Sequence, residues 1–159
     1  MANRNIAIYK ASTDNEELSQ IRSVLESKND LSKVLEFEES MRNFIGAKYA
    51  VATATSTAAI HLALSAIKFK RGDKILMSVN SFVNLPETVR HFDAEPIFVD
   101  INLEDMNLDI EKFEEAIIAN KSKKLRAAII TFIGGLAPNL DKIYEIGKKY
   151  NILIIEDCR

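Results

Sequence analysis

Small hydroxylated side chains run directly into a predicted helix before the middle of the chain. Residues 54–59 read ATSTAA, and the helix that they open is predicted at 57–68. The first amides of a helix have no partner within it, and with the helix dipole they attract an anion. The hydroxyls of Ser56 and Thr57 can add hydrogen bonds to such an anion. An ordinary helix cap explains the same residues, so the segment indicates either a phosphate site or a cap.

Two other candidate positions follow predicted strands. Phe82 follows the strand at 74–79, where an aromatic ring can stack on a planar ligand or simply fill the core. Glu156 and Asp157 follow the strand at 152–155. A carboxylate that leaves a buried strand needs a cation or a hydrogen-bond donor. That partner could be a metal, a protonated ring nitrogen or the amides at a helix start.

Other reactive side chains fit structural roles better. His61 lies among apolar residues of a predicted helix and is interpreted as a packed histidine, and His91 lies near a helix end, where the dipole stabilises its charge. Cys158 is the single cysteine and has no histidine near it in the sequence. We interpret it as a small neighbour of Asp157 rather than a nucleophile. No GxGxxG or GK[ST] segment supports a dinucleotide or P-loop site.

The elements that must position these side chains alternate along the chain. Helices are predicted at 14–26, 34–45, 57–68, 86–92, 110–119 and 140–150, and strands at 49–53, 74–79, 96–99, 127–133 and 152–155. The strands are short and almost wholly apolar, as expected where both faces of a sheet are covered. The alternation predicts an α/β fold with a mostly parallel sheet and helices on both faces. Ligands of such sheets bind beyond the carboxyl ends of the strands.

Composition limits the classes of partner. The 159 residues are 47% hydrophobic and 28% charged, with a formal net charge of −2. This balance is typical of a soluble globular domain and argues against a nucleic-acid partner. No apolar run approaches the roughly 20 residues that span a bilayer, and no signal-peptide core is visible near the N-terminus. With one cysteine favouring a reducing compartment, we expect a cytoplasmic protein without a membrane partner.

Several segments, taken in order, resemble the DegT family of nucleotide-sugar aminotransferases, which use pyridoxal phosphate on the type I aminotransferase fold. The similarity runs from about Leu18 to the end of the chain. The segments that carry it are FE (37–38), FIGAKYAV (44–51), TSTAAIHLAL (55–64), GDKI (72–75), SFV (81–83), AEPIFVD (94–100) and IIED (154–157). Ordered matches at the family's spacing are more specific than any single motif.

The resemblance implies a role for each candidate residue. Ser56 and Thr57 would hold the cofactor phosphate, Phe82 would stack on the pyridine ring, and Asp157 would pair with the ring nitrogen and keep it protonated. No metal is implied. The cofactor would be pyridoxal 5′-phosphate, with pyridoxamine phosphate as its alternate form. A homodimer would use glutamate to aminate a nucleotide-linked keto sugar in amino-sugar and polysaccharide biosynthesis.

The resemblance also implies how much of such an enzyme the sequence contains. It would be the N-terminal part of the cofactor-binding large domain, with a helical segment at 1–46 and βα repeats at 47–159. The Schiff-base lysine and the small C-terminal domain would lie beyond Arg159, so this polypeptide alone is expected not to turn over. Three residues depart from the family pattern: Ser56 replaces glycine or alanine, Phe132 replaces a histidine, and Arg159 replaces a small residue near the ring.

Two other functions stay open on the sequence. A pyridoxamine phosphate-dependent sugar dehydratase has histidine in place of the lysine, and the distinguishing position lies past Arg159. A non-catalytic α/β binding module would be a stable monomer that ignores the cofactor. The front part of a larger domain should instead expose a sheet edge and apolar surface, and should therefore associate.

Overall fold

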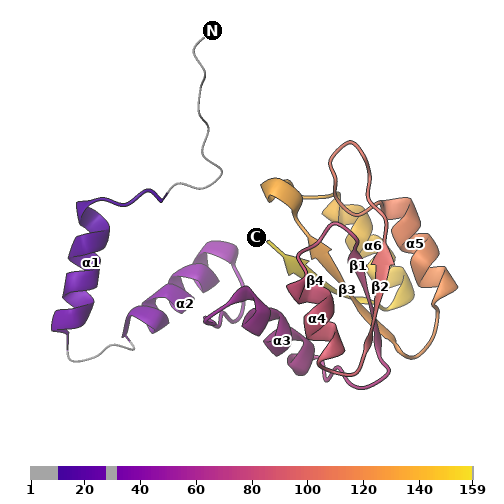
Figure 1. The fold of residues 1–159 in the computed structure, drawn as a ribbon, viewed down its shortest axis with the longest axis horizontal. Coiled ribbons are helices and arrows are strands. Elements are labelled where there is room, and N and C mark those ends of the chain that lie inside the picture. The colour runs from indigo at the N-terminus through magenta and orange to yellow at the C-terminus, as the bar shows by residue number, and fades with distance from the viewer. Residues whose placement is uncertain (1–10, 28–31, 159) are drawn as a thin grey trace, which may run out of the picture. The chain divides into compact units, whose positions relative to one another are not determined.

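The computed structural model describes residues 11–27 and 32–158 (Figure 1). In this part the helices are α1 (Asn15–Glu26), α2 (Ser32–Ile45), α3 (Ser56–Ala66), α4 (Asn84–Arg90), α5 (Ile110–Ala119) and α6 (Leu140–Tyr150). The strands are β1 (Lys74–Ser78), β2 (Glu95–Val99), β3 (Leu125–Thr131) and β4 (Leu153–Asp157), and a short 3₁₀ helix, η1 (Ile133–Gly135), follows β3. No helix in these ranges has the length and apolar character needed to cross a membrane.

Short polar side chains fix where the helices begin. Asp109 Oδ1 accepts hydrogen bonds from the amides of Glu111 and Lys112, each at 3.0 Å, and so caps α5. Asn139 caps α6 in the same way. These contacts satisfy amides that have no partner within the helix. The helices that the sequence predicts are therefore all present, with small shifts at their ends.

One predicted strand is wrong. The chain at 49–53 forms no strand, and the amide of Ala52 donates instead to Glu38 Oε1 at 2.8 Å. An apolar run predicts a strand only where a neighbouring strand accepts its hydrogen bonds, and here a side chain takes that place. The strand predicted at 127–133 ends at Thr131, since Gly134 and Gly135 adopt positive φ angles of 61° and 78° and turn the chain into η1.

The chain divides into two compact units, Met1–Ala52 and Thr53–Arg159. The described part of the first unit consists mainly of α1 and α2. A capping box starts α1, in which Asp14 accepts from the amide of Glu16 and Glu17 accepts from the amide of Asp14. The division of the sequence into domains at 46/47 stays a prediction.

The second unit contains a four-stranded sheet in the order β2-β1-β3-β4, with every neighbouring pair parallel. Two parallel strands can be joined only by a long crossover connection. Helix α4 connects β1 to β2, α5 connects β2 to β3, and α6 connects β3 to β4. The register places Ser78 beside Val99 and Thr131 beside Asp157. The strands therefore all end at the same edge of the sheet.

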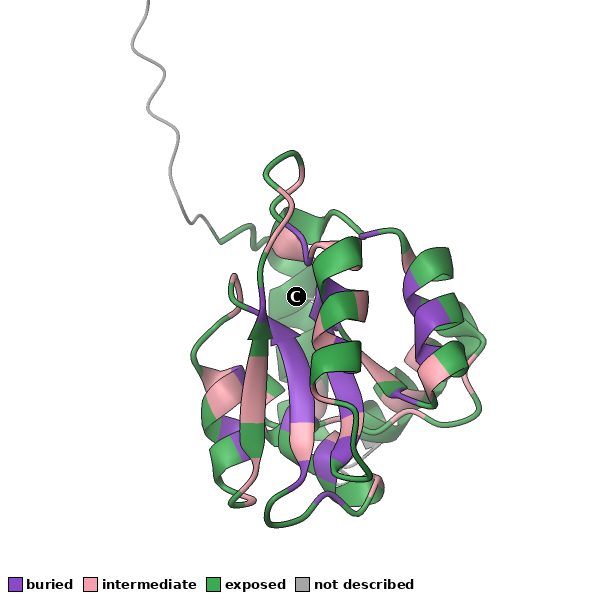
Figure 2. Ribbon diagram, turned by 90° about the vertical axis from the view of Figure 1, so that its right-hand side faces the viewer, coloured by how far each residue is buried: buried purple, intermediate pink, exposed green. Residues whose placement is uncertain are grey.

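Helices cover both faces of this sheet, as predicted (Figure 2). On one face, α3 and α4 pack against alternate strand residues in a cluster of Ile60, Leu64, Leu85, Val89, Ile75, Met77, Ala127 and Ile129, together with Phe69. On the other face, α5 and α6 pack in a cluster that includes Phe113, Ile117, Ile143, Ile146, Leu76, Ala128 and Ile130. Full burial of a leucine, isoleucine, valine, methionine or phenylalanine side chain in these clusters stabilises the fold by about 1.5–3 kcal/mol.

The amino ends of the strands are fastened by a buried carboxylate. Asp73, directly before β1, lies 3.4 Å from Arg126 Nη1 and 3.8 Å from Lys124 Nζ. Arg126 also donates to the carbonyl of Ile67 just after α3. This network ties α3, β1 and β3 together at the end of the sheet opposite the candidate residues. We therefore assign Asp73 a structural role.

Candidate functional site

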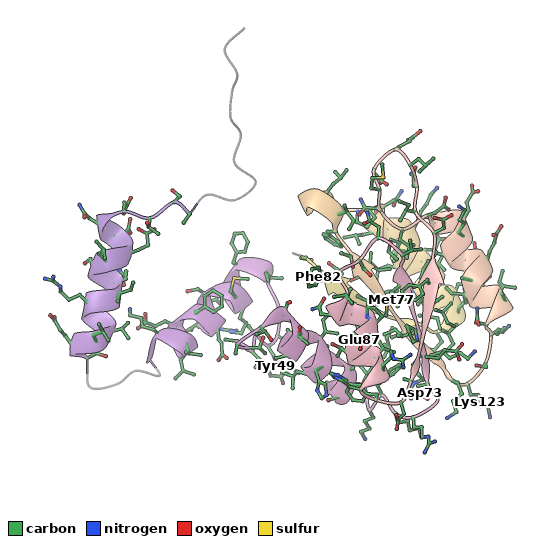
Figure 3. The ribbon with its side chains drawn as sticks, in the orientation of Figure 1. Tyr49, Asp73, Met77, Phe82, Glu87 and Lys123 are labelled. Atoms are coloured by element: carbon green, nitrogen blue, oxygen red, sulfur yellow. The ribbon has the colours of Figure 1, made fainter. Side chains whose placement is uncertain are left out.

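The candidate site lies at the carboxyl ends of the strands. Phe82 follows β1 and Asp157 ends β4, whereas Asp73 and Lys123 lie at the opposite end of the sheet (Figure 3). Helix α3 presents its first turn at the same edge, because a side chain at the start of α4 contacts it directly. Ser56 and Asp157, about a hundred positions apart in the sequence, thus lie at the same edge of the sheet.

The first turn of α3 contains both a cap and unused donors. Thr55 is the cap: its Oγ1 accepts from the amide of Ala58 at 3.1 Å and its carbonyl accepts from the amide of Ala59 at 3.1 Å. Within the described residues, the amides of Ser56 and Thr57 have no partner. The two interpretations left open by the sequence are therefore compatible, since Thr55 caps the helix and the next two residues present donors.

Asn84, the first residue of α4, joins this turn. Its Nδ2 atom donates to Ser56 Oγ at 3.4 Å and to Thr57 Oγ1 at 3.1 Å. Asn84 is not predictable from the sequence, because nothing in residues 81–84 shows that α4 starts beside α3. The only available signal is a side-chain amide that directly follows the SFV segment.

Phe82 is not a core residue. This residue is 63% exposed, in the loop between β1 and α4, and its carbonyl accepts a hydrogen bond from the amide of Leu85. Of the two roles that the sequence allowed, core filling is therefore wrong. An exposed ring can stack on a planar ligand, and the stacking role of Phe82 stays a prediction.

Asp157 is a buried carboxylate on the face of the sheet that α3 and α4 cover. Its neighbour two positions back, Ile155, packs on the α3–α4 cluster, and strand side chains alternate between faces. Asp157 is 5% exposed, and its Oδ2 accepts from Thr131 Oγ1 at 3.3 Å. The carbonyl of Asp157 also accepts from the amide of Phe132 at 3.0 Å. The carboxylate is thus held in place at the edge where Phe82 and α3 also lie.

Glu156 lies on the opposite face. The hydroxyl of Tyr144, on α6, donates to Glu156 Oε1, and this hydrogen bond raises the pKa of Tyr144 to about 12. Burial, reinforced by the charges of Glu156 and Asp157, raises the pKa of Cys158. A thiol that stays protonated agrees with its interpretation as a non-nucleophilic neighbour. Of the two adjacent carboxylates, Asp157 alone faces the candidate site.

Comparison with known proteins decides the family. The pattern of the DegT/DnrJ/EryC1/StrS aminotransferase family matches residues 11–159. The chain belongs to this family. It shares 33% identity over 126 residues with the UDP-2-acetamido-2-deoxy-3-oxo-D-glucuronate aminotransferase of Pseudomonas aeruginosa, covering 79% of this chain and 34% of that protein. With the UDP-4-amino-4-deoxy-L-arabinose–oxoglutarate aminotransferase of Shewanella sediminis it shares 28% over 160 residues, covering 99% and 40%.

A solved relative confirms the fold. The Escherichia coli GDP-4-keto-6-deoxy-D-mannose-3-dehydratase, whose structure contains bound hydrated pyridoxal phosphate, matches with a TM-score of 0.85 and 27% identity, covering 96% of this chain and 40% of the dehydratase. The α/β fold with a parallel sheet is thus that of the pyridoxal phosphate-dependent members of the family. The chain spans 34–40% of the length of these three relatives.

A buried side-chain amide connects the loop after β2 to the loop after β3, at the same edge of the sheet as the candidate site. Asn107, between β2 and α5, accepts from the amide of Ile133 and donates to the carbonyl of Leu136, each at 3.1 Å. Phe132, which departs from the family pattern, is half-buried and packs against the α5–α6 cluster. It therefore contributes to packing on the face opposite the candidate residues. Arg159, the other bulky departure, lies outside the described residues.

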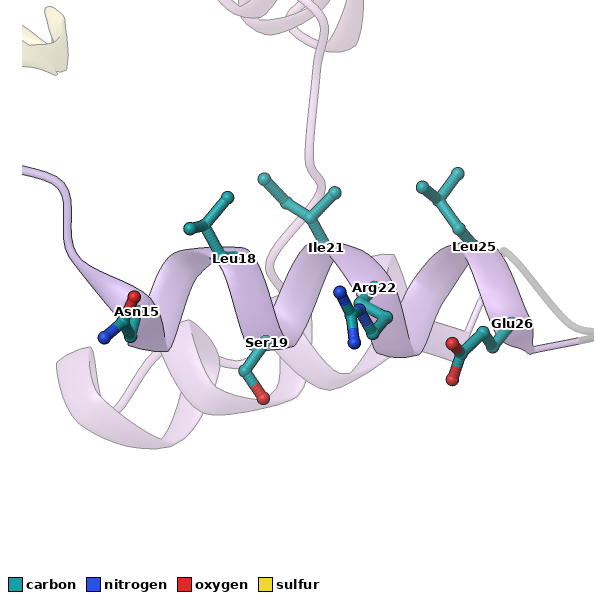
Figure 4. A pocket seen from close by; sticks show the side chains of 7 residues that line it. All are labelled: Asn15, Leu18, Ser19, Ile21, Arg22, Leu25 and Glu26. Carbon is teal, nitrogen blue, oxygen red and sulfur yellow. The ribbon is translucent and has the colours of Figure 1, made fainter.

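Other features of the described residues do not indicate a binding site. A hollow along α1 is lined by residues of that helix alone, so no second element contributes a group to it (Figure 4). No cluster of three or more histidine, cysteine, aspartate or glutamate side chains in the described ranges is arranged to hold a metal ion. The ring of His61 lies against that of Phe92, with centroids 4.7 Å apart and the planes tilted by 34°. His61 is nevertheless exposed, so it is not the buried, packed histidine that the sequence predicted.

Proposed function

We propose that this chain forms the cofactor-binding front part of a pyridoxal phosphate-dependent aminotransferase that acts on a nucleotide-linked keto sugar. Family membership and the names of the two aminotransferase relatives support the reaction class. The assignment of cofactor-binding roles to particular residues rests on one structural observation. The buried Asp157, the exposed Phe82 and the donors at the start of α3 share one edge of the sheet.

The chemistry of these side chains fits a pyridine ring with a phosphate tail. The first turn of α3 offers hydroxyl and amide donors to a group that only accepts hydrogen bonds. Phe82 offers a ring face, and Asp157 offers an acceptor to a protonated ring nitrogen. A desolvated carboxylate favours a cationic partner strongly, which suits a pyridinium better than a neutral ligand.

Each of these residues would then have a defined task. Bound pyridoxal phosphate supplies an electron sink for the carbanion formed next to the substrate nitrogen. Asp157 holds the proton at the ring nitrogen, and the Thr131 hydroxyl orients that carboxylate. Ser56 and Thr57 bind the phosphate and so fix the position of the ring. Phe82 covers one face of the ring and excludes water from it.

The proposal extends to the partners. We propose glutamate as the amino donor, since the Shewanella relative is named for oxoglutarate, which is the keto acid that glutamate becomes on losing its amino group. We also propose pyridoxamine phosphate as the alternate cofactor form, a homodimeric assembly and a cytoplasmic location. The product would enter amino-sugar and polysaccharide biosynthesis, in keeping with the sugar-nucleotide names of the relatives.

A sugar dehydratase is the second candidate. The match to the E. coli dehydratase is as extensive as those to the aminotransferases, with 96% of this chain covered. Both reactions would use a cofactor bound at the same edge of the sheet. The sugar product separates them, because an aminotransferase leaves an amino group on the sugar, whereas a dehydratase eliminates one hydroxyl and a neighbouring hydrogen as water and leaves no nitrogen on the sugar.

Titration of the chain with pyridoxal phosphate tests the cofactor assignment directly. Cofactor absorbance and intrinsic tyrosine fluorescence should change in a saturable way, and the melting temperature should rise because the ligand binds the folded state. The same titration with pyridoxamine phosphate should saturate as well. If neither compound perturbs the fluorescence or the melting temperature, the proposed cofactor site is wrong.

A further inference from the structure

A single side chain connects the first turns of two helices at the candidate site. Asn84 Nδ2 lies 3.1 Å from Thr57 Oγ1 and 3.4 Å from Ser56 Oγ, which are consecutive residues at the start of α3. Asn84 is half-buried at the start of α4, which packs beside α3 in the same core cluster. Its position is therefore set by the packing of the two helices.

The direction of these hydrogen bonds determines what the hydroxyls can do. A side-chain amide nitrogen only donates, so the oxygens of Ser56 and Thr57 act as acceptors toward Asn84. A hydroxyl has one hydrogen of its own, which then points away from the amide. Both hydroxyls are thereby left as donors to a further group.

The backbone at this turn has the same polarity. The side chain of Thr55 accepts a hydrogen bond from the amide of Ala58, and its carbonyl accepts one from the amide of Ala59. The amides of Ser56 and Thr57 have no acceptor within the described part of the chain. Two hydroxyls and two amides therefore present donors at the positive end of the α3 dipole.

We propose that Asn84 is a positioning residue for the phosphate of the cofactor. It holds the Ser56 and Thr57 hydroxyls in the orientation in which both donate to phosphate oxygens. This inference rests on the proposed function, because it takes the phosphate-bearing cofactor as the ligand of this edge. It adds a residue from α4, and it makes phosphate recognition depend on how α3 and α4 pack.

Two substitutions separate the hydrogen bonds from the charge. Asn84→Leu keeps much of the side-chain volume but removes the amide, so the hydroxyls are free to turn toward other acceptors. Asn84→Asp keeps the shape, replaces the donor by an acceptor and adds a negative charge that repels phosphate. We expect the affinity for pyridoxal phosphate to fall about tenfold in Asn84→Leu and further in Asn84→Asp.

The readout is selectivity, measured by titrating each variant with pyridoxal phosphate and with pyridoxal, which lacks the phosphate. Affinity for pyridoxal should stay unchanged in Asn84→Leu, and inorganic phosphate should compete less well with pyridoxal phosphate than in the parent chain. Asn139→Asp is the matched control: it makes the same chemical change at the cap of α6, where aspartate serves equally well. It should leave both affinities as they are.

The outcomes are distinguishable. If the parent chain binds pyridoxal phosphate no better than pyridoxal, the proposed phosphate site fails and the role of Asn84 fails with it. If the parent chain prefers pyridoxal phosphate but Asn84→Leu retains that preference, only the role of Asn84 is overturned. An equal loss of affinity for both compounds, with a lower melting temperature, would show a merely structural role and would also overturn the proposal.

Discussion

The adjacent carboxylates Glu156 and Asp157 perform different tasks because a strand sends successive side chains to opposite faces. Asp157 faces α3 and α4 and accepts a hydrogen bond from the Thr131 hydroxyl. Glu156 faces α6 and accepts a hydrogen bond from the Tyr144 hydroxyl. The sequence indicated that a carboxylate at this strand end needs a partner, but not which partner each would find. That choice depends on register and on which helices cover which face.

Replacing Asp157 tests the proposed pairing with the ring nitrogen. Asp157→Asn keeps the shape and an acceptor for Thr131, but it removes the charge that favours a protonated ring. Hydrogen bonds to charged groups contribute about 1.5–3 kcal/mol, so the affinity for pyridoxal phosphate should fall roughly tenfold to a hundredfold. Spectrophotometric titration would measure this loss.

Asp141→Asn, on the exposed surface of α6, is the control for the Asp157 experiment. It makes the same chemical change away from the strand ends and should leave the affinity unaltered. An Asp157→Asn chain that binds the cofactor as tightly as the control would remove Asp157 from the site.

Tyr144 should titrate at unusually high pH. Its hydrogen bond to Glu156 raises its pKa to about 12 in the folded state, compared with about 10 in an unfolded chain. The contribution to stability is therefore complete below pH 10 and is lost as the pH rises toward 12. Tyr144→Phe should thus lower the melting temperature at neutral pH, and the difference from the parent chain should shrink above pH 10.

Phenolate absorbance provides an independent check on Tyr144. The chain has four tyrosines, so the difference between the parent and Tyr144→Phe titrations isolates this one. A difference curve with its midpoint near pH 10 would contradict the hydrogen bond to Glu156.

Most elements of this fold follow from local sequence, because apolar runs, helix caps and turn residues act over a few positions. The strand predicted at 49–53 was wrong for a non-local reason, since the amide of Ala52 donates to Glu38 Oε1, 14 positions away in the sequence. Asn84 was missed for a similar reason. Its contacts lie 27 and 28 positions away and exist only because α3 and α4 share one face.

Gly147 on α6 shows tertiary packing opposing helix propensity. A Cβ atom at this position would lie 3.1 Å from the carbonyl oxygen of Ile152 and 3.1 Å from two side-chain atoms of Ile154. The amide of Ile152 is itself fixed by a 2.8 Å hydrogen bond to the carbonyl of Gly147, so the backbone there cannot easily move. The glycine allows α6 to approach the start of β4 closely.

Gly147→Ala should therefore destabilise the chain although alanine favours helices. The propensity gain is about 1 kcal/mol, whereas overpacking a tight site costs about 1–3 kcal/mol. We expect a net loss of about 1 kcal/mol in the free energy of unfolding, measured by urea denaturation. Glu145→Ala, exposed on the same helix, should change stability by less than about 0.5 kcal/mol. A stabilised Gly147→Ala chain would show that α6 and β4 can separate without cost.

At the scale of the whole molecule, the two edge strands of the sheet, β2 and β4, are only partly covered. Within the described residues, β4 pairs with β3 alone. Leu153 is 50% exposed, and Ile154 and Ile155 are only half-buried. A strand edge that combines unpaired backbone groups with exposed apolar side chains is a site for pairing with another chain. The relatives are longer than this chain, and the sequence alone predicted such an edge for the front part of a larger domain.

We therefore expect the purified chain to associate as its concentration rises, and we expect Leu153→Lys to reduce that association. A charge on the edge strand stays solvated in the monomer but would be desolvated in a strand-to-strand contact. Light scattering over a concentration series measures the effect. Leu103→Lys is the control, because Leu103 is more exposed than Leu153 but lies in the loop between β2 and α5.

If the parent chain scatters as a monomer at every concentration, its exposed edge does not pair with other chains, and this result would favour the self-contained binding module. If both variants reduce scattering equally, general surface charge rather than the β4 edge controls association.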